Sequence, residues 1–255
     1  SGGSDAPAIK SLAIKADNGW TLSGHKSWIS NAAAADILSV YANTDPSNGW
    51  RGIACFLIDA DLAGVKRGQT YDLMGGHALG TGEFAFDKVA LSTEDLFLPT
   101  ERAFKEAMAG IDLARVNVAA MACGMLSSAL AQAISYAQTR EVFGQAVAEL
   151  QGPQWQLADV ATDLAAARAL TYQAANALKA DADATILSAH AKKFATRMAL
   201  ERISDCMQVM GAAGFRTDRS LGRHLACAKM AQYLDGTTEI QNVVISRGFA
   251  RRNEP

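Results

Sequence analysis

The stretch Val116–Ala137, VNVAAMACGMLSSALAQAISYA, carries no formally charged residue and is long enough to cross a lipid bilayer. It also contains polar residues that are costly in lipid, namely Asn117, Ser127, Ser128, Gln132 and Ser135. Its many alanines suit close packing between helices inside a protein. We therefore predict a buried helix of a helical bundle here, and no membrane span.

The sequence on both sides of this stretch extends the helical pattern. Alanine-rich segments run from about residue 104 to 138, 154 to 180 and 184 to 210, and a shorter one starts near Thr237. Apolar residues recur at helical spacing, as in Leu157, Val160, Ala161, Leu164 and Ala167. Long helices with short connections predict an antiparallel four-helix bundle over residues 98–255.

The first part of the chain has a different pattern. Short apolar runs lie at residues 11–16, 20–22, 37–42, 53–58, 64–67 and 83–86, with Gly, Asn and Asp between them. Asn18-Gly19 between two such runs predicts a β-hairpin. We predict an antiparallel β-barrel or sandwich over residues 1–97, so the expected fold class is α+β with two domains.

Composition narrows the possible functions. The 255-residue chain has a net charge of −2, which gives no electrostatic case for nucleic acid or a membrane surface. Its cysteines and histidines show no metal-ligand spacing, so no metal site and only reduced, structural cysteines are expected. The chain starts at Ser1 without a signal-peptide pattern, which makes the cytoplasm the expected location and suggests a trimmed or truncated chain.

Two clusters stand out on chemical grounds. Trp28 and Ser30 in KSWISN, residues 26–31, would share a face if this segment is a strand, and a ring beside a hydroxyl suits a planar polar ligand. An ordinary core tryptophan is the alternative.

The second cluster, DGTTEIQ at residues 235–241, reads as a turn into a helix. On physical grounds Asp235 is best explained as the helix N-cap, with Glu239 as a first-turn acid, although a helix N-terminus can also bind a phosphate or a carbonyl oxygen.

Five motifs, in order, resemble those of acyl-CoA dehydrogenases. They are residues 1–5 with 8–10 (SGGSD, AIK), 26–31 (KSWISN), 140–144 (REVFG), 208–215 (QVMGAAGF) and 234–241 (LDGTTEIQ). Each motif is weak alone, but their shared order and spacing are specific. The resemblance covers the whole chain and implies a middle β domain and a C-terminal helical domain, without the family's N-terminal helical domain.

The resemblance implies an FAD-dependent enzyme that oxidises the Cα–Cβ bond of an acyl-CoA and passes electrons to an electron-transfer flavoprotein. It also implies a homodimer or homotetramer. By motif position Asp235 would be the catalytic base. The implied FAD contacts are Trp28, Ser30, Arg140, Phe143, Gln208, Gly211, Ala212, Thr237 and Glu239, of which Arg140, Phe143, Gln208, Gly211 and Ala212 would act across a subunit interface. Ser4, Arg115 and Gly236 would lie at the substrate.

The chain departs from the family pattern at several positions. Aspartate replaces the usual glutamate at 235, and a positional error of about 1 Å in a catalytic group can cost about 100-fold in rate. Ala114 occupies the other position that carries the base in some subgroups, so Asp235 is the remaining candidate. Leu234, Ala212 and the pair Ala226-Cys227 also differ from the family motifs.

Two alternatives stay open. The chain can be a relative with another substrate, such as a nitroalkane, because aspartate serves as the base in family members of that kind. It can also be a fragment or a non-catalytic subunit, in which the fold is kept without turnover.

Overall fold

The computed structural model describes residues 3–251, so Ser1 and Gly2 of the first motif lie outside the described residues. By its internal contacts the chain divides into two units, residues 1–110 and 111–255. The long helix α1, Thr100–Thr139, runs through this division.

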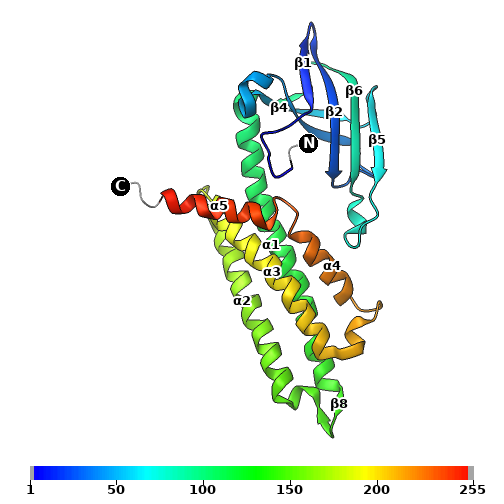
Figure 1. Cartoon of the computed structure of the whole chain (residues 1–255), viewed down its shortest axis with the longest axis vertical. Coiled ribbons are helices and arrows are strands. Elements are labelled where there is room, and N and C mark those ends of the chain that lie inside the picture. Colours follow the sequence, from blue (N-terminus) through cyan, green and yellow to red (C-terminus); the bar gives the residue numbers. More distant parts are fainter. Residues whose placement is uncertain (1–2, 252–255) are drawn as a thin grey trace. The chain divides into compact units, whose positions relative to one another are not determined.

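The first unit is built on one seven-stranded sheet with the order β5-β6-β2-β1-β3-β4-β7 (Figure 1). The strands are β1 Leu12–Ala16, β2 Gly19–Ile29, β3 Ile37–Asn43, β4 Ile53–Asp59, β5 Val65–Thr70, β6 Gly82–Leu91 and β7 Leu96–Leu98. Two short 3-10 helices, η1 Pro46–Gly52 and η2 His77–Leu79, lie in the connections. Neighbouring strands are antiparallel except β1 and β3, which are parallel.

The predicted hairpin is confirmed, since β1 and β2 pair from Leu12 with Ser23 to Ala16 with Gly19. Gly19 has a φ of 144°, and a Cβ atom built there would lie 1.9 Å from the carbonyl oxygen of Leu91. Only glycine permits β2 to approach the end of β6 this closely. Gly19 is therefore required both by the turn and by the close approach of β6 to β2.

The prediction of a barrel or sandwich is not confirmed. The strand order of the described residues is open, with β5 and β7 at its two edges. Alternate residues of the central strands form one apolar core around Leu22, Phe56, Phe84 and Val89, all at most 1% exposed. The α+β class and the mostly antiparallel sheet agree with the prediction.

The second unit is helical. Its elements are the remainder of α1, the strands β8 Glu141–Val142 and β9 Gln145–Ala146, α2 Gln151–Lys179, α3 Thr185–Met210, α4 Leu221–Ala231 and α5 Thr238–Arg251, with η3 Val147–Glu149 and η4 Gly211–Phe215. The three long helices and the one near Thr237 were predicted, but α4 was not. A four-helix bundle is therefore not confirmed, because the described residues form five α-helices.

The core of the helical unit joins α1, α2, α3 and α4, with Leu126, Val160, Ile203 and Leu221 among its buried members. Helix α1 is long and apolar enough to span a membrane by length and composition alone. Residues along one side of α1, from Val116 to Ala133, are part of this core. The buried side agrees with the predicted role as a bundle helix.

Candidate functional site

Residues 232–236 form the turn that connects α4 to α5, and we call this segment the 232–236 turn. The structure corrects the expected N-cap, because Thr237, not Asp235, caps α5. The Thr237 hydroxyl accepts from the N–H of Ile240 at 3.4 Å, and its carbonyl accepts from the N–H of Gln241 at 3.0 Å. Glu239 lies in the first turn of α5, as predicted. The helix cap, which was the purely structural explanation for an aspartate at position 235, therefore does not apply.

Two consecutive residues of this turn have left-handed backbone conformations, Asp235 at φ 50° and Gly236 at φ 94°. Aspartate tolerates this region better than most residues, but a non-glycine residue there still costs roughly 1 kcal/mol. At Gly236 an added Cβ would lie 3.0 Å from Nε2 of Gln241. Such a conformation persists only where surrounding groups hold it.

Three side chains from three helices hold the turn by its carbonyl oxygens. Nζ of Lys192 on α3 donates to the carbonyl of Gln232 at 3.2 Å and to that of Gly236. Nε2 of Gln241 on α5 donates to the carbonyls of Gly236 at 2.9 Å and Asp235 at 3.4 Å.

The third side chain, Arg115 on α1, donates from Nε to the Asp235 carbonyl at 3.3 Å. Its Nη1 also bonds Oδ1 of Asp112 at 2.8 Å, and the two side chains are only 8% and 11% exposed. Asp112 accepts further bonds from the hydroxyls of Thr185 at 2.8 Å and Ser188 at 3.2 Å. Arg115 was predicted to face substrate, and here its described partners are Asp112 and the 232–236 turn.

The environment of Asp235 suits a carboxyl group that exchanges a proton. Burial raises the pKa of the Asp235 carboxyl above its ordinary value, while the nearby charges of Lys192 and Arg115 oppose that rise. Burial also lowers the pKa of Lys192 to about 8. The exposed Glu239 carboxyl, in the first turn of α5, accepts hydrogen bonds from the backbone of Glu239 and from the side chain of Thr237, and these lower its pKa.

The Trp28-Ser30 cluster lies at the end of β2, where the strand is irregular. The pairing of β2 with β6 shifts between Lys26 and Ile29, and Trp28 has a φ of 61°. Ser30 follows the last residue of β2. The expectation of regular strand alternation through this pair is therefore wrong. Trp28 is 68% exposed, and its ring lies 4.5 Å from that of Tyr71 between centroids. A core tryptophan is excluded.

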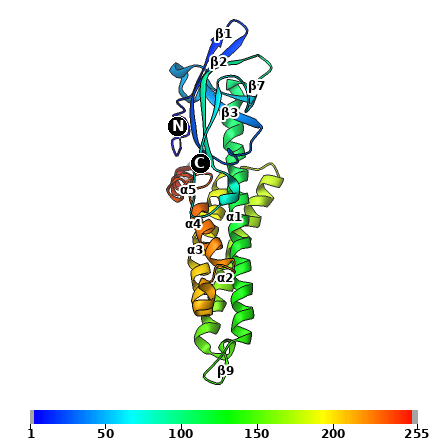
Figure 2. The same ribbon diagram turned by 90° about the vertical axis from the view of Figure 1, so that its right-hand side faces the viewer.

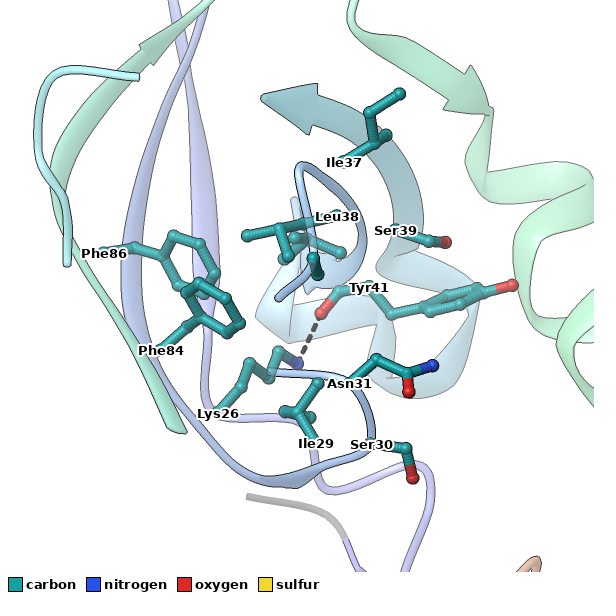
Figure 3. A pocket seen from close by; sticks show the side chains of 12 residues that line it. Lys26, Ile29, Ser30, Asn31, Ile37, Leu38, Ser39, Tyr41, Phe84 and Phe86 are labelled. Carbon is teal, nitrogen blue, oxygen red and sulfur yellow. Dashed lines mark hydrogen bonds between the residues drawn. The ribbon is translucent and has the colours of Figure 1, made fainter. Parts of the chain in front are cut away.

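A cavity of about 360 Å³ lies beside this cluster within the first unit (Figure 3). It exists because β1 begins at Leu12, opposite Ser23, so β2 beyond that point has no β1 partner. Nζ of Lys26 bonds the carbonyl of Tyr41 on β3 at 2.6 Å, and burial lowers the Lys26 pKa to about 8. Ser30 lines the cavity, and Phe84 and Phe86 lie on its β6 side.

The remaining predicted cofactor residues lie at one end of the helical unit. Phe143 is 94% exposed at the tip of the β8–β9 hairpin, with a φ of 52°, and Arg140 directly precedes β8. Gln208, Gly211 and Ala212 lie at the C-terminal end of α3, which reaches the same end of the unit in both views (Figures 1 and 2). A left-handed conformation is uncommon for a residue other than glycine, and it places the Phe143 ring out in solvent at the hairpin tip.

The structure thus forms two groups in the helical unit. One group, at the 232–236 turn and the start of α5, contains Arg115, Asp235, Gly236, Thr237 and Glu239. The other contains Arg140, Phe143, Gln208, Gly211 and Ala212. In the first unit, Ser4 is exposed in a turn. Among the described residues there is no cluster of His, Cys, Asp and Glu able to hold a metal ion.

Sequence reasoning missed Lys192, Asp112 and the role of Gln241. A signal for Lys192 was present, because it occupies a position of α3 where neighbours at helical spacing, Ala195 and Ala199, are buried. A charged residue on the apolar side of a helix requires a partner. The partners are backbone carbonyls, which no sequence pattern marks.

Comparison with known proteins identifies the family of the chain. The family model for the acyl-CoA dehydrogenase C-terminal domain matches residues 102–250, and the model for the acyl-CoA dehydrogenase middle domain matches residues 1–89. The short-chain specific acyl-CoA dehydrogenase of Megasphaera elsdenii is 35% identical over 250 residues, which are 98% of this chain and 65% of that protein.

Solved structures give the same result. A butyryl-CoA dehydrogenase from Megasphaera elsdenii superposes with a TM-score of 0.94 at 35% identity, covering 98% of this chain and 65% of that one. A structure described as an electron transferring flavoprotein of Acidaminococcus fermentans has a TM-score of 0.95 at 35% identity, covering 98% and 66%. The chain spans about two-thirds of the length of these relatives. It belongs to the acyl-CoA dehydrogenase family.

Proposed function

We propose that the protein carrying this chain is an FAD-dependent acyl-CoA dehydrogenase with Asp235 as its catalytic base. The observation that carries the proposal is the state of Asp235. It stands at the family's base position, does not cap α5, and has a partly buried carboxyl whose pKa is raised by burial. A general base works best with a pKa near the working pH, and an ordinary exposed aspartate lies well below it.

The residues present fit FAD. The exposed ring of Trp28 offers a large aromatic face, and the hydroxyl of Ser30 offers a donor close to it in sequence. The start of α5 carries the Thr237 hydroxyl, and the N-terminal end of a helix suits a pyrophosphate. When bound, FAD would supply the acceptor for a hydride from the substrate β carbon.

The chain's own residues have two tasks in this reaction. The Asp235 carboxylate takes the α-proton of the acyl-CoA, and the electron pair of that C–H bond becomes the new Cα–Cβ double bond as the β-hydrogen leaves with its pair. The N–H of Asp235 is a candidate donor to the thioester carbonyl, where negative charge develops as the proton leaves. Such donors are usually the largest electrostatic contribution to a reaction of this type.

A nitroalkane is the second candidate substrate. Asp235 also favours this substrate, since aspartate replaces the family's usual glutamate at this position. The chemistry at the base is similar, because a proton is again removed from carbon beside an electron-withdrawing group. The two substrates differ in the need for CoA contacts, for which Ser4 and Arg115 are the proposed residues. Arg115 is already engaged by Asp112, which weakens the case for a direct CoA contact.

We further propose a homodimer or homotetramer, with an electron-transfer flavoprotein as electron acceptor. The support for self-association is the exposed group at the β8–β9 hairpin, where Phe143 has almost no cover from its own chain. In an assembly Arg140, Phe143, Gln208, Gly211 and Ala212 would reach the FAD of a neighbouring subunit. Sedimentation at micromolar concentration should give a dimer or tetramer, and a monomer would count against this part of the proposal.

The test of the function uses the longest form of the protein that its gene encodes. The purified protein should be yellow, and an acyl-CoA added without oxygen should bleach the flavin. Bleaching by a nitroalkane alone would favour the second substrate class. A colourless protein that does not take up FAD would support a non-catalytic role.

A further inference from the structure

Lys192 is the least expected charged residue of the helical unit. It is 1% exposed and ranks among the largest fully buried side chains, although lysine is almost never buried without partners. Its partners are the carbonyls of Gln232 and Gly236, which stand at the two ends of the 232–236 turn. One ammonium group therefore closes the turn that carries the proposed base.

The geometry points to Lys192 as a positioning residue for Asp235: its ammonium group clamps the 232–236 turn and supplies a positive charge that acts on the Asp235 carboxyl. This inference rests on the proposed function. It assigns to a residue outside the motifs the task of setting both the place and the charge state of the base.

The backbone of the 232–236 turn needs groups that hold it in place. Asp235 and Gly236 both have positive φ, a conformation that the turn would leave if nothing held it. Gln241 and Arg115 bond the carbonyls of Asp235 and Gly236 only, whereas Lys192 also reaches Gln232 at the end of α4. Loss of Lys192 removes the bonds that tie the two ends of the turn to each other. The backbone bonds from Gln232 and Tyr233 into α4 remain, so the turn should shift rather than unfold.

Charged groups from four helices surround the 232–236 turn. Those that face the turn are Arg115 with its partner Asp112 on α1, Lys192 on α3, Lys229 on α4 and Glu239 on α5. Since Asp112 bonds Arg115 directly, the charge of Arg115 is largely balanced. Lys192 has no carboxylate within salt-bridge distance among the described residues, so its charge acts on Asp235 with less compensation.

The test compares Lys192→Met with Lys193→Met in the complete, FAD-loaded protein. Lys193 is the next residue on α3, is only partly buried, and makes no hydrogen bond to the turn among the described residues. Both variants lose one positive charge and gain the same side chain. Anaerobic stopped-flow bleaching by substrate gives the rate of flavin reduction as a function of pH.

We expect Lys192→Met to reduce flavin about 100-fold more slowly, because displacement of a catalytic group by about 1 Å costs about that much. The acid limb of its pH profile should move to higher pH, since the charge that opposed the raised pKa of Asp235 is gone. Lys192→Arg, which keeps the charge and the donors, should recover part of the rate and restore the limb. Lys193→Met should behave as the wild type.

The outcomes separate the two proposals. If the wild type does not reduce its flavin with an acyl-CoA or a nitroalkane, the proposed function fails. The positioning role is overturned by a different result. In that result the wild type reduces its flavin, and Lys192→Met loses only thermal stability, with the pH profile of the wild type and the rate of Lys193→Met. Should Lys192→Met not fold, Lys192→Gln, which keeps a donor without the charge, must show the shifted limb, and an unshifted limb there also overturns it.

Discussion

Replacement of Arg115 by methionine tests whether the buried ion pair holds the 232–236 turn to α1. Arg115 and Asp112 are 2.8 Å apart with side chains 8% and 11% exposed, so neither charge is well solvated. Arg115→Met removes this pair and the 3.3 Å bond to the Asp235 carbonyl, and leaves Asp112 as a buried anion. Removal of one partner from a buried pair typically costs 3–5 kcal/mol.

Two hydroxyl donors remain on Asp112, from Thr185 at 2.8 Å and Ser188 at 3.2 Å. We therefore expect a loss near the lower end of that range, about 3 kcal/mol in the free energy of unfolding. The double variant Asp112→Asn with Arg115→Met removes the unpaired charge as well. It should recover about 0.5–3 kcal/mol of that loss, the usual coupling energy between contacting groups.

The assay is urea unfolding followed by helical circular dichroism, which reports the helical unit. The control is Arg197→Met on α3, which breaks an ion pair of similar length, 2.9 Å to Glu201, but with side chains 64% and 49% exposed. An exposed pair of this spacing is worth about 0.5 kcal/mol. If Arg115→Met costs no more than Arg197→Met, the burial argument for this pair is refuted.

Three further predictions concern other parts of the chain. Phe56→Ala should lower the free energy of unfolding in urea by about 3–5 kcal/mol, because Phe56 is fully buried against Trp20. Leu57→Ala, at a site that is 43% exposed, should lower it by less than about 1 kcal/mol. Equal losses would contradict the assigned core. Burial raises the pKa of the Cys55, Cys123 and Cys206 thiols, so iodoacetamide should label Cys227 first in the folded protein, and equally fast labelling of Cys206 would contradict this. The Lys26 pKa of about 8 lies below the ordinary 10.5, so between these two pH values the unfolded chain binds a proton that the folded chain has released. The free energy of unfolding of the wild type, relative to that of Lys26→Met, should therefore rise with pH across this interval. A difference that does not change with pH would mean that Lys26 is not buried as a cation.

Local signals predicted the regular elements well. The Asn18-Gly19 turn and the alanine-rich periodicity lead directly to the β1–β2 hairpin and to α1, α2 and α3. Helix α4 was missed because it is short and carries Gly222, Arg223 and Lys229 in its eleven residues, which obscures an apolar face. Strand β7 has only three residues, too few for an alternating pattern.

The candidate site shows where sequence reasoning ends. Motif position pointed to Asp235 as the proposed base, which stays a prediction. The cap was misplaced by two residues, because the turn uses two successive left-handed residues that no local signal predicts. Regular alternation was expected through Trp28, and a register shift in β2 prevents it. The donors that hold the turn come from α1, α3 and α5, and only the folded chain brings them together.

The assignment of Asp235 as the base is tested by anaerobic flavin reduction by Asp235→Asn in the complete protein, followed by stopped-flow absorbance. The asparagine keeps the shape of the side chain, and Thr237 rather than residue 235 caps α5, so the helix and the bound FAD should be retained. If Asp235 is the base, the rate of flavin bleaching by substrate should fall on the order of 10²–10⁴-fold. Bleaching at close to the wild-type rate, with FAD bound, would show that Asp235 is not the base and that another residue takes the proton.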